Sequence, residues 1–300
     1  WSKKHNDNII YNRLVDNNYG SVIQNIHSKK ILKRLNRPIY DLNFQENYAL
    51  SLNFSRLHRL RPGYGYKNFV DNSIRKNSPV DDGVFLIDIH NNSSKLILSL
   101  DYLSKLKPRK SMIGAQHYIN HLSWSPSGKR FLFFHLWTKS NSRYSRLLTS
   151  DLNGKDLFIL ENSENVSHYD WINNSEIIIT THSKTNGLRY RIYYDKSEKK
   201  VDLSKSLNED GHPSFNPINK NVFVSDTYPN KFGDRELFLY DIKSNVKSNL
   251  VNIYSSIKYR SDYRCDLHPR WSNDAKLISF DSTHLGKRTT NIISVLDEKK

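Results

Sequence analysis

Short runs of alternating apolar and polar residues follow one another along the whole chain, separated by polar turns. The run at 120–135, NHLSWSPSGKRFLFFH, combines an H-x-x-W segment, a turn rich in Ser, Pro and Gly, and a return of β-formers. Two such runs joined by a short polar turn are typical of an antiparallel hairpin. No long apolar stripe at helical spacing interrupts the pattern. The sequence therefore predicts an all-β protein.

The unit that begins at His121 returns along the chain with the same internal offsets. His168 follows it after 47 residues, His212 after a further 44 and His268 after a further 56, each three positions before an aromatic residue. These intervals approach the roughly 40–50 residues of a four-stranded propeller blade. We therefore predict a β-propeller with six or seven four-stranded antiparallel blades.

Blade boundaries follow from the repeat. No linker rich in Gly, Ser or Pro divides the chain, so a single closed domain over 1–300 is expected. Trp1 and the NIIYN run resemble the aromatic anchor and returning strand of a blade whose first residues are missing. The six visible blades are predicted at about 1–40, 41–105, 117–160, 165–203, 209–251 and 264–298.

Composition adds a preference for acidic partners. The formal net charge is +16, which favours attraction of polyanions, although the chain is rich in Asn, Lys and Ile throughout. A single cysteine excludes an internal disulfide, and no apolar run approaches the ~18 residues that span a bilayer. No nucleic-acid-binding module is recognisable, so nucleic acid is not expected as a partner. The oligomeric state and the compartment stay open, with a secreted or periplasmic location favoured.

A long insertion at 55–82 interleaves cations and aromatics around a Pro-Gly turn. Guanidinium groups pair with carboxylates in two-point contacts, and phenols offer both a stacking face and a hydroxyl. We therefore predict that Arg61, Tyr64 and Tyr66 bind a sugar or phosphate ligand. The alternative is a solvated loop stabilised by its own aromatics.

Blade topology predicts where the repeated histidines lie. The start of the innermost strand and the end of the next strand emerge on the same face of a propeller. His121, His168, His212 and His268 stand at the first position, and His135 stands at the second. These side chains are expected to ring one mouth of the central channel. Alternatively, each histidine forms a hydrogen bond within its own blade, as in WD-type scaffold repeats.

Cys265 lies three residues before His268 in RCDLHPRW. With His168 and His212 from the two preceding blades, it completes a set of soft thiolate and imidazole ligands that suits a tetrahedral, structural Zn²⁺. If Cys265 is instead a buried apolar thiol, the three histidines leave an open site that could hold Mn²⁺ or Zn²⁺ against a substrate carboxylate. Ca²⁺ fits these ligands less well.

The motifs RPGYGY, QHYINH, SHYDW, DGHPSF with DTYP, and DLHPRW together resemble the β-propeller polysaccharide lyases, the group of oligogalacturonate and ulvan lyases. The resemblance extends from about residue 44 onward. It implies cleavage of an acidic, uronic-acid-containing polysaccharide by β-elimination. The ulvan enzymes carry a metal on His and Cys ligands, which map here to His168, His212, Cys265 and His268. The oligogalacturonate enzymes hold manganese with His and Gln, and Arg270 replaces their second histidine after His-Pro.

β-Elimination needs a neutralised uronate carboxylate, a base near C5 and a proton donor for the leaving O4. By analogy with the His, Tyr and Arg set of the ulvan lyases, Arg189 is assigned to the carboxylate. His121 or His135 is assigned to neutralisation or to the base, and Tyr228 or Tyr190 to acid–base transfer. His117 and Arg270 are expected to bind substrate.

Two alternatives belong to other functional classes. A non-catalytic glycan-binding or scaffolding propeller would bind an acidic polymer without forming an unsaturated product. Glycoside hydrolysis usually requires two carboxylates, and Asp210, Asp226 and Asp266 are the acidic residues that could serve it.

Overall fold

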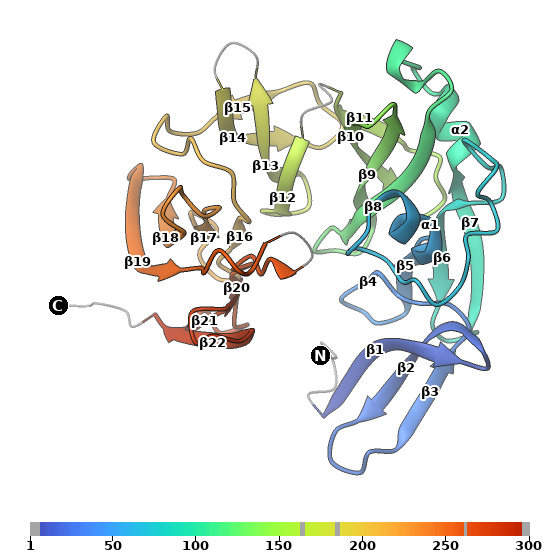
Figure 1. Cartoon of the computed structure of the whole chain (residues 1–300), viewed down its shortest axis with the longest axis horizontal. Helices are drawn as coiled ribbons and strands as arrows, with labels where there is room; N and C mark the ends of the chain where they lie inside the picture. The colour runs from blue at the N-terminus through green and yellow to red at the C-terminus, as the bar shows by residue number, and fades with distance from the viewer. Residues whose placement is uncertain (1–6, 163–165, 184–186, 261–262, 296–300) are drawn as a thin grey trace. The chain divides into compact units, whose positions relative to one another are not determined.

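The computed structural model describes residues 7–162, 166–183, 187–260 and 263–295. Its strands form six antiparallel sheets that follow one another along the chain, in the order of the predicted blades. The architecture is a nearly all-β, six-bladed β-propeller, which confirms the predicted fold class. Figure 1 shows each sheet as a separate group of arrows, from the blue β1–β3 to the red β20–β22. Trp1 lies outside the described residues.

The chain divides into two compact units, residues 1–164 and 165–300. Each is described by itself, and the single closed domain stays a prediction. The first unit contains one sheet of three strands and two of four among its described residues. Their bounds are β1 (Asn8–Val15), β2 (Asn18–Asn25) and β3 (Ile31–Leu35); β4 (Asp41–Leu42), β5 (Tyr48–Ser51), β6 (Gly83–Asp88) and β7 (Ser93–Ser99); and β8 (Gln116–Trp124), β9 (Arg130–Lys139), β10 (Ser142–Asp151) and β11 (Phe158–Glu161).

The second unit contains two sheets of four strands and one of three among its described residues. Their bounds are β12 (Val166–Trp171), β13 (Glu176–Ser183), β14 (Gly187–Tyr194) and β15 (Lys200–Asp202); β16 (Ser214–Phe215), β17 (Val222–Asp226), β18 (Asp234–Asp241) and β19 (Val246–Tyr254); and β20 (Arg270–Trp271), β21 (Leu277–Ser282) and β22 (Thr289–Ser294). Each predicted blade from 165 onward thus corresponds to one sheet.

Three short helical segments occur in the first unit: α1 (Phe54–Leu60), α2 (Leu100–Lys105) and the 3₁₀ turn η1 (Lys110–Met112). Asn53 caps α1 by accepting a hydrogen bond from the Arg56 amide, and Ser99 caps α2 in the same way. The insertion expected to be a loop therefore begins as a helix. None of the helices in the described part of the chain is long and apolar enough to cross a membrane.

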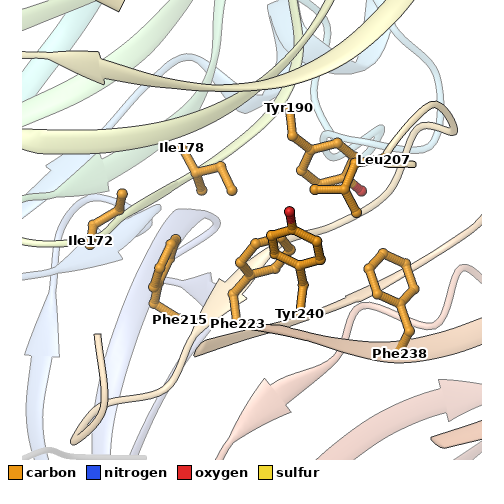
Figure 2. Close-up of a cluster of buried hydrophobic side chains, with 8 residues drawn as sticks. All are labelled: Ile172, Ile178, Tyr190, Leu207, Phe215, Phe223, Phe238 and Tyr240. Carbon is orange, nitrogen blue, oxygen red and sulfur yellow. The ribbon is translucent and has the colours of Figure 1, made fainter. Parts of the chain in front are cut away.

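Two central strands, β9 and β13, are buried on both faces over part of their length, which is why their sequences contain continuous apolar runs. In β9 the whole stretch from Phe131 to Trp137 is buried, and in β13 the residues Ile177–Ile179 are fully buried. In the second unit, aromatic and aliphatic side chains from neighbouring sheets pack into one cluster (Figure 2). This packing fixes the strands whose ends carry the polar groups described next.

Candidate metal centre

Three imidazole rings meet in the second unit, each from a different sheet. His168 lies in β12, while His212 and His268 directly precede β16 and β20. The ring centroids of His168 and His212 are 4.1 Å apart, and those of His212 and His268 are 4.0 Å apart. The structure therefore brings together three of the four repeat histidines. His121 belongs to the first unit, so its place beside them stays a prediction.

Backbone irregularities accompany two of these histidines, His168 and His268. The pairing register of β12 shifts between Val166 and Tyr169, so His168 lies within a β-bulge. His268 has a positive φ of 42°, an uncommon conformation for a residue other than glycine. Bulges redirect side chains out of the regular alternation of a strand. The repeat thus places its histidines where the chain leaves regular pairing.

The Nδ1 atom of each ring already has a partner. His168 Nδ1 lies 3.2 Å from Asp210 Oδ1, and His212 Nδ1 lies 2.8 Å from Asp226 Oδ1. His268 Nδ1 lies 3.3 Å from the carbonyl oxygen of Asp266. When Nδ1–H donates to an oxygen, the lone pair is on Nε2. All three rings therefore share the tautomer that leaves Nε2 as the possible metal ligand.

Asp226 joins two of the histidines through the main chain as well. Its buried carboxylate accepts the backbone N–H of His212 at 2.7 Å and that of His268 at 3.2 Å. Gly211 permits this close approach, because a Cβ there would lie 1.9 Å from the Asp226 carbonyl oxygen. Burial raises the pKa of Asp226, but the hydrogen bond and charge of His212 outweigh it and hold the pKa below its usual value. Asp226 is thus a buried anion that positions two rings.

Asp210 has the same relation to His168. It also accepts hydrogen bonds from the Thr180 hydroxyl at 2.9 Å and from the Gly211 amide at 3.0 Å. Burial raises its pKa, but the hydrogen bond and charge of His168 bring the net pKa below the usual value. The carboxylates Asp210 and Asp226, considered earlier as possible hydrolytic acids, are thus occupied in orienting imidazoles.

The third ring is kept neutral by its surroundings. Burial, and then the charge of His212, lower the pKa of His268 to about 4. A neutral imidazole is the form that binds a metal. His268 is therefore available as a ligand at neutral pH.

Three possible ligand atoms in this cluster lie within 4.8 Å of one another, one each from His212, Asp266 and His268. His168 is not part of this group, but its ring centroid lies 4.1 Å from that of His212. Nitrogen and oxygen donors supported by buried carboxylates suit a divalent transition-metal ion. We call His168, His212, Asp266 and His268 the histidine cluster, and its chemistry fits a metal.

Cys265 is not a member of the group of ligand atoms. Its side chain is buried, and its Sγ lies 3.9 Å from the Asp266 carbonyl oxygen. Burial raises the pKa of the thiol. The closed set of His168, His212, Cys265 and His268 is therefore not what the structure assembles, and Asp266 stands where the sequence predicted Cys265.

Tyr228 borders the histidine cluster. Its ring centroid lies 5.8 Å from that of His212 and 6.2 Å from that of His168. The guanidinium carbon of Arg264 lies 4.9 Å from the centroid of the Tyr228 ring. Arg264 also contacts Asp266 at 2.9 Å. Sequence reasoning identified Tyr228, considered Asp266 only as a possible hydrolytic acid, and missed Arg264, although both Arg264 and Asp266 flank Cys265 in RCDLH.

Arg189 and Arg270 have local partners. Arg189 donates a hydrogen bond to the carbonyl of Leu188 at 2.6 Å. Arg270 has a largely exposed side chain and lies 3.8 Å from Asp281. Their predicted substrate contacts stay predictions.

The structure corrects the placement of Tyr190 near an open mouth. Its side chain is 1% exposed and belongs to the cluster of Figure 2, and its hydroxyl lies 3.0 Å from Ser225 Oγ. Burial raises the pKa of this hydroxyl. Alternation along β14 turns Tyr190 inward. Its ring packs in the interior and cannot contact a polymer.

His117 and His135 are corrected in the same way. In the first unit His135 is 0% and His117 2% exposed. His117 Nδ1 lies 2.8 Å from His135 Nε2, and Arg146 Nε donates to His135 Nδ1 at 3.1 Å. The arginine thereby fixes both tautomers, with His135 Nε2–H donating to His117. These residues connect strands β8, β9 and β10 and do not face a substrate.

Three side chains of the first unit form a smaller, partly exposed group. Arg61 lies over the Tyr64 ring at 4.4 Å, and the Tyr64 and His121 rings meet edge to face at 5.9 Å. Tyr66 instead stacks on Phe54 at 4.5 Å inside the insertion. Of the predicted binding residues in the insertion, Arg61 and Tyr64 remain candidates, while Tyr66 packs the loop.

No protein-family model matches the chain, and no curated protein matches it in sequence. Solved structures do match. TolB from Acinetobacter baumannii superposes with a TM-score of 0.54 at 13% identity, over 92% of this chain and 57% of that chain. This chain thus spans a little over half of that TolB structure.

Two further solved structures are similar over most of both chains. An oligogalacturonate lyase in complex with manganese has a TM-score of 0.58 at 8% identity, over 99% of this chain and 88% of that chain. The β-propeller domain of the Trilobed protease from Pyrococcus furiosus has a TM-score of 0.58 at 12% identity, over 97% and 78%. At these identities the likeness establishes the propeller fold alone.

Proposed function

We propose that the protein is a metal-dependent lyase that cleaves a uronic-acid-containing polysaccharide by β-elimination. The observation that carries the proposal is the histidine cluster, in which three imidazoles with occupied Nδ1 atoms meet beside Asp266. The similarity to a propeller described as an oligogalacturonate lyase in complex with manganese agrees with a metal at such a cluster. In this proposal His212, Asp266 and His268, with His168 beside His212, would hold Mn²⁺ or Zn²⁺, which would bind the substrate carboxylate.

The reaction makes defined demands on the site. A base removes the proton from C5, the C4–O4 bond breaks, a C4=C5 double bond forms, and the departing O4 takes up a proton. A bound divalent ion would supply the positive charge that stabilises the enolate-like carboxylate. Tyr228, beside His168 and His212, is proposed to transfer a proton at its hydroxyl oxygen. Arg264 places a cation over the Tyr228 ring, 4.9 Å from its centroid.

The remaining predicted contacts are assigned to substrate binding. Arg61, Tyr64 and His121 in the first unit join a cation to two aromatic rings, a combination that suits an acidic sugar. Arg189 and Arg270 are proposed to attract the polymer through their charge. None of these residues is required by the proposal to contact the scissile bond.

The test is incubation with a panel of uronic-acid polysaccharides while the absorbance of 4,5-unsaturated ends is followed. Activity should disappear after dialysis against a chelator and return on addition of Mn²⁺ or Zn²⁺. The Tyr228→Phe variant should bind polymer normally and turn over about 10²–10⁴-fold more slowly. Tight binding without unsaturated ends from any polymer would replace this proposal with a glycan-binding propeller.

A further inference from the structure

A cavity of about 490 Å³ opens in the second unit, lined in part by Arg235 and Arg264, which both contact Asp266 of the histidine cluster. It lies between the turn that precedes β18 and the segment that follows β19. Its walls combine cations with aromatic rings, and no carboxylate lines it among the residues that the structure describes. We call it the basic pocket, and its charged and aromatic lining residues are Lys231, Phe232, Arg235, Tyr254, Tyr259, Arg260 and Arg264.

The positive charge of the basic pocket is only partly neutralised. Arg235 and Arg264 share one carboxylate, Asp266, at 3.3 and 2.9 Å. Arg235 is 2% exposed, and its Nε and Nη2 atoms have no hydrogen-bond partner among the described residues. A buried guanidinium with unpaired N–H groups is costly. Lys231 and Arg260 add two exposed cations at the rim. The pocket therefore holds excess positive charge that a bound anion would offset.

Its aromatic residues point to the kind of anion. Phe232 is 69% and Tyr254 54% exposed, although both are large apolar groups that usually pack away from water. An exposed aromatic face offers a platform for a flat, partly apolar ring such as a sugar. A small inorganic anion would make no stacking contact with these rings. Charge and rings together suit a sugar that carries a carboxylate or a sulfate ester.

The position of the basic pocket connects it with the proposed metal centre. Arg264 lines the pocket and covers the Tyr228 ring, which in turn borders His212. Asp266 belongs to the histidine cluster and also pairs with Arg235. One polymer chain that reaches the histidine cluster can therefore extend into this cavity.

We propose that the basic pocket is a binding subsite for an acidic sugar unit adjacent to the unit that is cleaved. This inference rests on the proposed lyase function, because that function places the polymer at the histidine cluster. The affinity of the pocket for acidic sugar does not depend on cleavage. The subsite would select substrate by charge without taking part in the proton transfers.

The test compares the double variant Lys231→Gln/Arg260→Gln with the control Lys205→Gln/Lys243→Gln. The control loses the same charge at exposed sites of the same unit outside the pocket. Binding of trigalacturonate, of its methyl ester and of a sulfated trisaccharide is measured by calorimetry, with metal and with chelator. The pocket variant should bind the acidic sugars at least about tenfold more weakly than wild type. The control variant should bind these sugars with nearly the wild-type affinity. The methyl ester should bind the pocket variant and the wild-type protein equally well. The sugar that loses more affinity in the pocket variant, carboxylated or sulfated, shows which acidic group the pocket prefers.

Equal losses in the pocket variant and the control would overturn the subsite, because net charge alone would then explain the binding. This result differs from failure of the proposed lyase, which would appear as the absence of unsaturated ends in wild-type protein. If the lyase is active, the pocket variant should raise KM for oligomers and leave kcat nearly unchanged. A fall in kcat with unchanged KM would also overturn the subsite.

Discussion

The two groups of histidines in this molecule arise from similar sequence patterns and have opposite surroundings. In the second unit, the Nδ1 atoms of His168 and His212 face the carboxylates of Asp210 and Asp226. In the first unit, His135 Nδ1 faces the guanidinium of Arg146, and His117 Nδ1 faces His135. The partner of Nδ1 therefore decides whether a ring nitrogen remains available for chemistry or is consumed in packing.

Charge reinforces this difference. Burial, and then the charge of Arg146, lower the pKa of His135 well below its usual value. Burial lowers the pKa of His117 to about 4. An arginine beside a histidine disfavours its protonation, whereas a carboxylate favours positive charge nearby, including that of a metal ion. Of these two groups of histidines, the one in the second unit is arranged to accept a cation.

The largest loss of stability should come from removing Arg146, the cation beside the histidines of the first unit. Arg146 donates through Nη1 to the Leu106 carbonyl at 2.8 Å and through Nη2 to the Leu103 carbonyl at 2.6 Å. Arg146→Leu leaves these carbonyl oxygens and His135 Nδ1 without a donor in the interior, so the free energy of unfolding should fall by about 3–5 kcal/mol. Urea unfolding measures it, with the exposed Arg143→Leu in the same strand as control. Equal stability of the two variants would show that the buried network is not structural.

Acid should destabilise the protein through one buried histidine of each unit, His117 and His268. Unfolded histidines titrate near 6.5, while His117 and His268 have folded pKa values of about 4. The unfolded chain therefore binds protons first as the pH falls, and stability is lost between about 6.5 and 4, by up to about 3 kcal/mol for each histidine.

Urea unfolding between pH 7 and 4.5, without metal, checks this slope. His117→Asn should remove part of it, whereas His90→Asn, at an exposed turn of the same unit, should leave it unchanged. A slope that is identical in the His117 variant and in wild type would contradict the assignment.

Metal affinity should depend on the histidine cluster of the second unit. His212→Ala removes the central ring of the histidine cluster and should weaken Zn²⁺ or Mn²⁺ binding by more than the ~10–100-fold that loss of a supporting residue costs. His182→Ala, at an exposed position of the same unit, is the control. Calorimetric titration measures both. Retention of full metal affinity in the His212 variant would place the ion elsewhere.

The smallest effect is expected at Cys265. Cys265→Ser should keep the metal stoichiometry, because the buried thiol is not among the ligand atoms of the histidine cluster. It should cost about 1–2 kcal/mol of stability for burying a hydroxyl. Metal analysis of the purified variant decides the matter. Loss of the ion would restore the closed site predicted from the sequence.

The repeat made the fold and part of the site predictable from sequence. His168, His212 and His268 stand at equivalent positions of successive sheets, so blade topology alone predicts that they meet. Cys265 was misjudged because alternation was not applied to RCDLH. Cys265 and Leu267 are buried, while Asp266 and His268 are half-buried on the other side of the extended segment.

Other errors came from strands without a polar face. Every residue from Phe131 to Trp137 in β9 is buried, so alternation gives no sign of where His135 points. Its partner Arg146 belongs to a different strand, and sequence reasoning had no reason to join them. The basic pocket was equally hidden, since it assembles residues from both ends of the β18–β19 hairpin.

Arg56 has a consequence for how the insertion responds to proteases. Its Nε donates to the His117 carbonyl at 2.6 Å, and its Nη2 donates to the carbonyls of Lys76 and Asn77 at 3.0 and 2.8 Å. Its Nη1 reaches the carbonyl and hydroxyl oxygens of Ser73. A protease must draw out an extended stretch of chain before it cuts. One buried side chain thus makes a long segment with little regular structure a poor target for cleavage.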